Sequence, residues 1–250
     1  MILYLTLALC AAIFGWQVYR YDLHDREPIP ALVLAAALGA LAMWLAALAQ
    51  LALMKKFGAL GISSDHWGVS MSLVAAVTEE LAKLAAVVMV IGLRPRWFND
   101  PLDGLIYGAF AGLGAAIEES LVVLSGHTAP MLPATEPVRL AGHLLMGGIG
   151  GFGLAYLKLG RRGWQGRLAA GLLAAIALHA TWDIVAFDAA DRGGLTPWHT
   201  IAAMTIMLGG MVIFRSMIRL AAGEKRGSGG RRGFSLDLEN GLADRRQVPT

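Results

Sequence analysis

Charged side chains and cysteines are scarce in this chain. Only 16% of its 250 residues are charged and 56% are hydrophobic, whereas soluble domains typically have about 25% charged residues. The mean hydropathy is +0.58. This composition excludes an ordinary soluble domain and predicts an integral membrane protein. The single cysteine, Cys10, excludes an internal disulfide framework and a cysteine-rich metal site.

The first twenty residues, MILYLTLALCAAIFGWQVYR, lack the features of a cleaved signal peptide. No basic region precedes the apolar run, and no small-x-small cleavage site follows it. The stretch LALC is similar to a lipoprotein cleavage site, but Leu9 stands where a small residue is expected. We therefore expect a retained first helix, and a cleaved or lipidated start is the less favoured alternative.

Long apolar runs make up most of the chain. Backbone groups in lipid must pair internally, so each run of roughly 20 residues predicts a membrane-spanning helix. The expected fold is an all-α polytopic membrane helical bundle with about seven transmembrane helices, within residues 1–220. Residues 221–250 are polar, Gly-rich and basic, and we expect a disordered cytoplasmic tail there. The seven apolar runs are residues 1–19, 30–54, 71–93, 101–125, 137–158, 166–187 and 196–220.

The distribution of Lys and Arg between the loops predicts the orientation. One side of the membrane receives more basic residues than the other, and the richer side is the cytoplasmic one. This places the N-terminus outside and the C-terminus in the cytoplasm. The richer side has Arg20, Arg26, Arg94, Arg96, Lys158, Arg161, Arg162, Arg167 and the basic tail, and the poorer side has Lys55, Lys56, Arg139 and Arg192.

A few polar side chains interrupt the apolar runs. A charged residue at the bilayer centre costs about 2.5–3.5 kcal/mol on insertion scales, so each such residue calls for a partner or a role. Counted from the helix ends, Glu79, Glu119, His143 and His179 all lie roughly 9–12 Å below the outer boundary. Four segments that place a carboxylate or imidazole in one layer predict a single buried polar site. The alternative is a row of polar contacts that stabilises helix packing and carries out no chemistry. The interrupting residues are Glu79, Glu80, Lys83, Glu118, Glu119, His143, His179 and Asp183.

Local spacing indicates how these groups support one another. Lys83 follows Glu79 by four residues and Glu80 by three, so it can pair with either on one helix face. It would keep one carboxylate ionised while the other stays available for chemistry. His179 and Asp183 are also four residues apart, and Asp183 is expected to orient the imidazole.

Five motifs in order resemble the PrsW family of polytopic intramembrane proteases, which is related to CAAX-type membrane endopeptidases. EELAK matches its EExxK motif, and DGLIYGAFAGLGAAIEES matches a DGxxYG segment that ends in a glutamate. That segment begins at Asp103 and its glutamate is Glu119, although Glu118 precedes it and Ser120 replaces the usual Asn. The remaining matches are the EP at Glu27, the His-plus-glycine helix GHLLMGGIGGFGLAY with His143, and HATWD with His179 and Asp183.

The resemblance implies an intramembrane endopeptidase of a bacterial-type inner membrane that hydrolyses a peptide bond of a membrane-protein substrate. An anti-sigma factor cleaved in stress signalling is one such substrate, and no nucleic-acid partner is implied. Glu79 would be the general base and Glu119 would anchor the water. His143 and His179 would stabilise the oxyanion. Glu80, which is grouped with these four residues as a catalytic candidate, would form an ion pair with the supporting Lys83. The other supporting candidates are Asp103, Glu118 and Asp183.

A metal-dependent version uses the same residues. Two carboxylates and two imidazoles suit one divalent metal such as zinc with a position left for water. The candidate ligands are Glu79, Glu119, His143 and His179. The HExxH spacing of soluble zinc proteases is missing, so the sequence leaves the glutamate-dependent and metal-dependent mechanisms open.

Two readings without protease activity compete with this one. Intramembrane Glu, His and Asp side chains also serve as relays in proton- or ion-coupled transporters. The sequence shows no inverted repeat and no matched pair of broken helices, which many transporters have. A catalytically inactive immunity or scaffold protein on the same fold is the other alternative.

Overall fold

The computed structural model describes residues 1–20, 26–59, 67–126 and 131–244, with side chains described as far as residue 223 except at 57–59 and 67. Within these ranges the chain is all-helical. A short 3-10 helix, η2 (Pro95–Trp97), connects two of the α-helices. The α-helices are α1 (Ile2–Tyr19), α2 (Ile29–Ala59), α3 (Trp67–Leu93), α4 (Asp103–Ser125), α5 (Thr135–Lys158), α6 (Trp164–Asp191) and α7 (Pro197–Asp244).

The predicted helical bundle with about seven transmembrane helices is confirmed. Six of the described helices are long and apolar enough to cross a membrane. The remaining one, α3, has 27 residues, and any 18-residue window along it contains Glu79, Glu80 and Lys83. The three charged residues thus set α3 apart from the other helices.

Helix ends differ from the predicted ends by a few residues. Helix α2 continues to Ala59 and α6 to Asp191, beyond the apolar runs that ended at residues 54 and 187. An apolar run measures the thickness of the hydrocarbon layer, whereas backbone hydrogen bonding carries a helix on into the polar boundary.

The last helix extends into the segment expected to be a tail. Helix α7 continues to Asp244, so the backbone is helical through most of residues 221–250, where we expected disorder. The division into a transmembrane domain and a separate basic tail stays a prediction.

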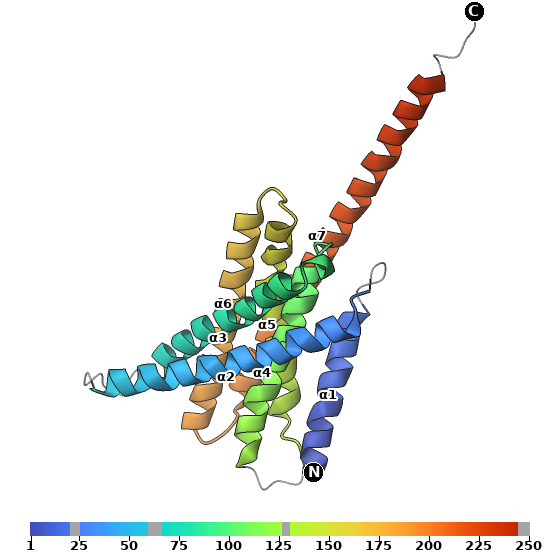
Figure 1. The fold of residues 1–250 in the computed structure, drawn as a ribbon. Helices are drawn as coiled ribbons and strands as arrows, with labels where there is room; N and C mark the ends of the chain where they lie inside the picture. The colour runs from blue at the N-terminus through green and yellow to red at the C-terminus, as the bar shows by residue number, and fades with distance from the viewer. Residues whose placement is uncertain (21–25, 60–66, 127–130, 245–250) are drawn as a thin grey trace, which may run out of the picture.

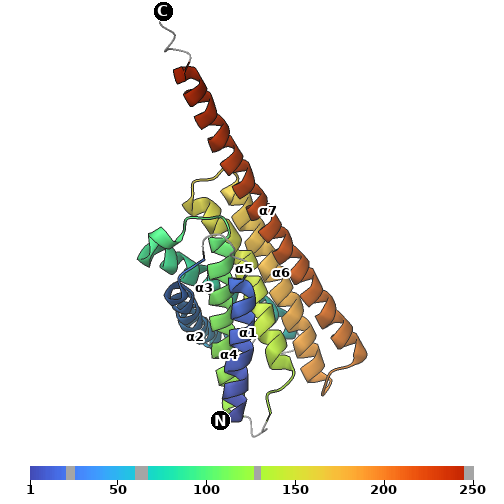
Figure 2. The same cartoon turned by 90° about the vertical axis from the view of Figure 1, so that its right-hand side faces the viewer.

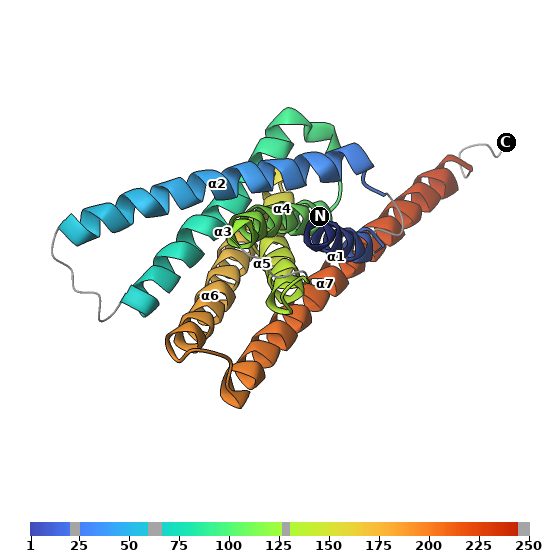
Figure 3. The ribbon, with the colours of Figure 1, turned by 90° about the horizontal axis from the view of Figure 1, so that it is seen from below.

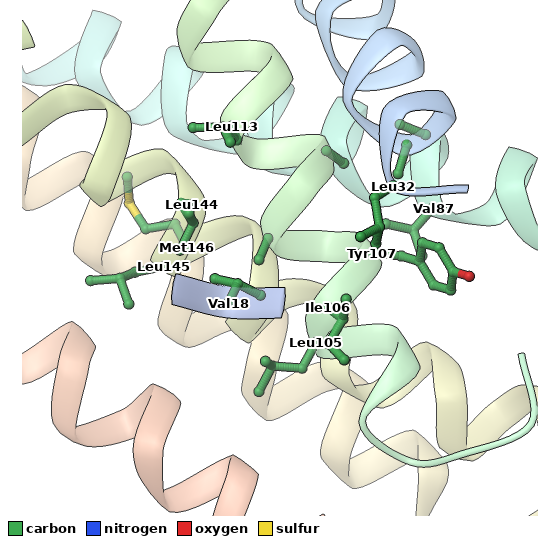
Figure 4. Packing of buried hydrophobic residues seen from close by; sticks show 14 of the residues in the cluster. Val18, Leu32, Val87, Leu105, Ile106, Tyr107, Leu113, Leu144, Leu145 and Met146 are labelled. Carbon is green, nitrogen blue, oxygen red and sulfur yellow. The ribbon is translucent and has the colours of Figure 1, made fainter. Parts of the chain in front are cut away.

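Helices α4 and α5 form the centre of the bundle. Figure 3 shows them surrounded by the other helices, and in Figure 2 they run alongside α1. Helices α2 and α3 form a hairpin that crosses this central pair obliquely (Figure 1). A buried apolar cluster holds the α2–α3 pair against the central helices, with Tyr107 of α4, Val87 of α3 and Leu144 of α5 among its members (Figure 4).

Close approach of α4 and α5 depends on glycine. A Cβ atom at Gly112 would overlap the backbone carbonyl of His143, and one at Gly108 would overlap that of Gly147. Small residues at such interfaces let helix backbones come together in a membrane. The contact at Gly112 brings His143 against α4, two turns before Glu119.

Candidate active site

Polar side chains from four helices meet in one buried cluster. Glu79 and Glu80 come from α3, Glu119 from α4, His143 from α5, and His179 with Asp183 from α6. The imidazole rings of His143 and His179 lie 5.1 Å apart between centroids, at 68° to each other. Their exposed fractions are 3% and 2%. The structure therefore brings together the four groups that the sequence places in one layer.

His179 lies between carboxylates of two helices. Its Nδ1 is 2.8 Å from Oε1 of Glu80, while its Nε2 faces Oε2 of Glu79 at 3.4 Å and Oδ2 of Asp183 at 3.6 Å. The hydrogen bond that orients the ring is therefore accepted by Glu80 of α3. The sequence had predicted that Asp183 would orient the ring. With Glu80 as acceptor, the proton resides on Nδ1 and Nε2 is available to the cluster.

Lys83 pairs with Glu80. Its Nζ lies 2.5 Å from Oε1 of Glu80, and the two side chains are 2% and 1% exposed. A buried ion pair is tolerated when both charges are matched and further hydrogen bonds satisfy them. Oε1 of Glu80 contacts both Lys83 and His179, so this oxygen is shared between the ion pair and the imidazole.

Glu119 and His143 form a second carboxylate–imidazole pair. Oε2 of Glu119 is 3.2 Å from Nε2 of His143, and Oε1 is 3.4 Å from Nε of Arg139. Nη1 of Arg139 also donates to both carboxylate oxygens of the buried Glu136, at 3.0 and 3.1 Å. The Glu119 side chain is 33% exposed, so the cluster is most open at this point.

Sequence reasoning missed two members of this arrangement. The sequence identifies Arg139 only as a basic residue near a helix end, and its pattern does not mark Gln50 as a site residue. Nε2 of Gln50 lies 3.3 Å from Oε1 of Glu79 and 2.8 Å from Oγ1 of Thr78. Gln50 is the one polar side chain in the apolar run 30–54. An isolated amide in an apolar helix was the signal that could have found it.

Two predicted supporting residues do not join the cluster. Asp103 lies at the start of α4, sixteen residues before Glu119 and therefore about 24 Å away along the helix. Its Oδ2 accepts hydrogen bonds from the backbone N–H groups of Asn99 and Asp100, at 2.6 and 2.7 Å. Glu118 is half-buried, and within the described part of the chain no hydrogen bond or ion pair ties it to the cluster.

Three side chains of the cluster suit a metal ion. Glu79, His143 and His179 are all buried and offer ligand atoms that lie within 4.8 Å of one another. Oε2 of Glu79 and Nδ1 of His143 are buried without a hydrogen-bond partner in the described residues. Tetrahedral zinc with bonds of about 2.1 Å separates its ligand atoms by roughly 3.4 Å, as Glu79 Oε2 and His179 Nε2 are here. The donor set fits zinc.

The supporting carboxylates also fit this reading. Each imidazole uses one nitrogen toward a carboxylate, Glu119 for His143 and Glu80 for His179. Metal-binding histidines commonly engage a carboxylate in this way through the second ring nitrogen. The predicted fourth ligand, Glu119, is not part of the three-residue group and contacts His143 instead.

Comparison with known proteins agrees with these motifs. The model of one protein family, described as PrsW family intramembrane metalloprotease, matches residues 27–213. No curated protein and no solved structure matches the chain. The matched region includes every polar side chain of the cluster and covers well over half of the chain. On this match, the chain belongs to the PrsW family of intramembrane proteases.

Proposed function

We propose that the protein is an endopeptidase that hydrolyses a peptide bond of a membrane-protein substrate at the Glu79–His143–His179 cluster. The observation that carries this proposal is Oε2 of Glu79, which is buried, lacks a hydrogen-bond partner among the described residues and faces Nε2 of His179 at 3.4 Å. A free carboxylate oxygen beside an imidazole nitrogen has the chemistry needed to take a proton from water.

Each side chain then has one task. In the version without a metal, Glu79 accepts the proton of the attacking water at Oε2 and later returns it to the leaving amine. His143 and His179 stabilise the negative charge that develops on the carbonyl oxygen as imidazolium ions, because each ring needs one N–H for its carboxylate and a second N–H to donate to the oxyanion. Glu119 orients His143, and Glu80 orients His179 while Lys83 balances the charge of Glu80.

In the metal-dependent version, Glu79, His143 and His179 would hold one divalent ion such as zinc. Such an ion, when bound, polarises the scissile carbonyl and activates water. The remaining residues keep the tasks given above, since Glu80 and Glu119 contact the second nitrogen of each imidazole. Removal of divalent ions by a chelator therefore separates the two versions.

We place the protein in a bacterial-type inner membrane, with its N-terminus outside and its C-terminus in the cytoplasm. Support comes from the basic residues near the helix ends. In this orientation the cluster lies in the outer half of the membrane. A single-span membrane protein fits as substrate because its helix can enter from the lipid, and an anti-sigma factor is the candidate that the family resemblance suggests.

The test is cleavage of tagged single-span membrane proteins in liposomes by the purified protein under single-turnover conditions. We expect cleavage by the wild type and a loss of at least ~100-fold in Glu79→Gln. Glu118→Gln is the matched control, because it neutralises a carboxylate of α4 outside the cluster, and it should cleave normally. Equal cleavage by wild type and Glu79→Gln would remove Glu79 from the mechanism. No cleavage by the wild type across a broad substrate panel would overturn the proposed activity.

A further inference from the structure

We propose that Gln50 of α2 is a positioning residue for Glu79. Its side-chain amide holds Oε1 of Glu79, so that Oε2 is the oxygen presented to His179 and to the substrate. This inference rests on the proposed function, because it assigns a role in the same reaction. It also explains why an apolar membrane helix has one amide side chain.

The contacts of Glu79 divide between its two oxygens. Oε1 lies 3.3 Å from Nε2 of Gln50, on the side of α2. Oε2 lies 3.4 Å from Nε2 of His179 and lacks a hydrogen-bond partner among the described residues. A carboxylate held at one oxygen cannot rotate freely, so the other oxygen keeps a constant direction.

The direction of the Gln50 amide follows from its partners. The hydroxyl of Thr78 donates to the backbone carbonyls of Val74 and Ala75, at 2.7 and 3.1 Å. That hydroxyl can therefore only accept from Gln50, at 2.8 Å. The carboxylate of Glu79 is an acceptor as well. Two acceptors require the amide nitrogen, and not the amide oxygen, to face α3.

The position of Gln50 makes the contact specific. Gln50 is half-buried and contacts α3, whereas Leu48 and Leu51 of the same helix are 45% and 55% exposed. An amide facing lipid would lack partners, and in a membrane every polar group needs one. The bond to Thr78 anchors the amide to α3, and the second bond then reaches the next residue, Glu79.

This arrangement predicts an effect on the chemical step. Misplacing a reacting group by about 1 Å can cost 10²-fold in rate, and loss of a residue that orients a reacting group or ligand typically costs 10–100-fold. Gln50 contacts Oε1 of Glu79 and not Oε2, the oxygen assigned to the reaction, so substrate binding should change little. The expected signature is a lower kcat with an almost unchanged KM.

The experiment compares Gln50→Met, which keeps the length of the side chain but removes the donor, with Leu51→Met as the matched control. We expect kcat to fall about 10–100-fold in Gln50→Met, with KM within about threefold and Leu51→Met unchanged. Thr78→Val removes the hydroxyl that anchors the amide, and its kcat should lie between those of Gln50→Met and Leu51→Met. A rise in KM at constant kcat, or an equal loss in Leu51→Met, would overturn the proposal.

A double-mutant cycle separates positioning from a general structural effect. Glu79→Asp keeps a carboxylate but withdraws it from Gln50, so adding Gln50→Met to Glu79→Asp should cause little further loss. A fully additive loss would show that Gln50 acts elsewhere and would overturn the inference.

An infrared measurement tests the contact without using activity. A carboxyl stretching band that disappears in Glu79→Gln should shift in Gln50→Met, because the hydrogen bond to Oε1 is lost. A band that does not shift would overturn the proposal even if the protein cleaves its substrate. A shifted band in a protein that cleaves nothing would support the contact and count against the peptidase activity instead.

Discussion

Nδ1 of His179 lies 2.8 Å from Oε1 of Glu80, and the same oxygen lies 2.5 Å from Nζ of Lys83. One carboxylate oxygen thus orients an imidazole of α6 and neutralises a lysine of its own helix α3. This explains why adjacent glutamates are useful inside a membrane helix. Under the proposed function, Glu80 would be the supporting carboxylate and Glu79 would keep an oxygen for chemistry.

Glu80→Gln should destabilise the protein as well as lower its activity. Lys83 would remain as a buried charge without its counter-ion, and breaking a buried pair from one side costs about 3–5 kcal/mol. Thermal unfolding in detergent measures this loss. Adding Lys83→Met removes the stranded charge and should restore most of the stability without restoring cleavage, because the orienting carboxylate is still absent.

Asp183→Asn provides the comparison for this pair. Asp183 lies 3.6 Å from Nε2 of His179 and is partly exposed, which is too far for a hydrogen bond. We expect less than a ~10-fold loss of cleavage, against 10–100-fold in Glu80→Gln. A larger loss of cleavage in Asp183→Asn would show that Asp183 orients His179, as the sequence predicts.

Arg139→Gln should lower kcat because it releases Glu119 from one of its two contacts. We expect a loss of roughly 10-fold, measured as kcat and KM at saturating and limiting substrate. The stranded Glu136 would also lower stability, and adding Glu136→Gln should recover stability but not kcat. The matched control is Arg192→Gln, whose ion pair with Asp188 is exposed and should contribute little. Normal kcat in Arg139→Gln would exclude a role for Arg139.

Metal content provides a prediction that does not depend on cleavage. If zinc is the cofactor, single substitutions Glu79→Gln, His143→Ala and His179→Ala should each lower zinc affinity strongly, as measured by competition with a chromogenic chelator. Asp103→Asn, at the far end of α4, should bind zinc like the wild type. Full zinc affinity in all three cluster variants would refute the metal-dependent version at this site.

Gly112→Ala should disturb the site through the helix interface. The added methyl group would overlap the carbonyl of His143, so α4 and α5 would have to separate. We expect a lower unfolding temperature, consistent with an overpacking cost of about 1–3 kcal/mol, together with weaker activity. Gly126→Ala is the control, because a Cβ atom there meets nothing within 4 Å. Equal stability of both variants would contradict the close packing.

The sequence by itself determined the helices and indicated the residues of the candidate site. Apolar runs of sufficient length can only be helices in lipid, and a polar side chain inside such a run is costly enough to stand out. Glu79, Glu119, His143 and His179 were found in this way, and the order of the motifs indicated the family that the comparison confirmed.

Only the tertiary structure decided which side chains touch. The spacing within one helix proposed Asp183 as the partner of His179, but the crossing of α3 and α6 brings Glu80 closer, at 2.8 Å against 3.6 Å. Gln50 contacts Glu79 and Arg139 contacts Glu119 only because helices far apart in the sequence pack together. Periodicity determines which residues share a face of one helix. The angles and depths at which helices cross depend on packing across the whole bundle, and these set the distances on which the chemistry depends.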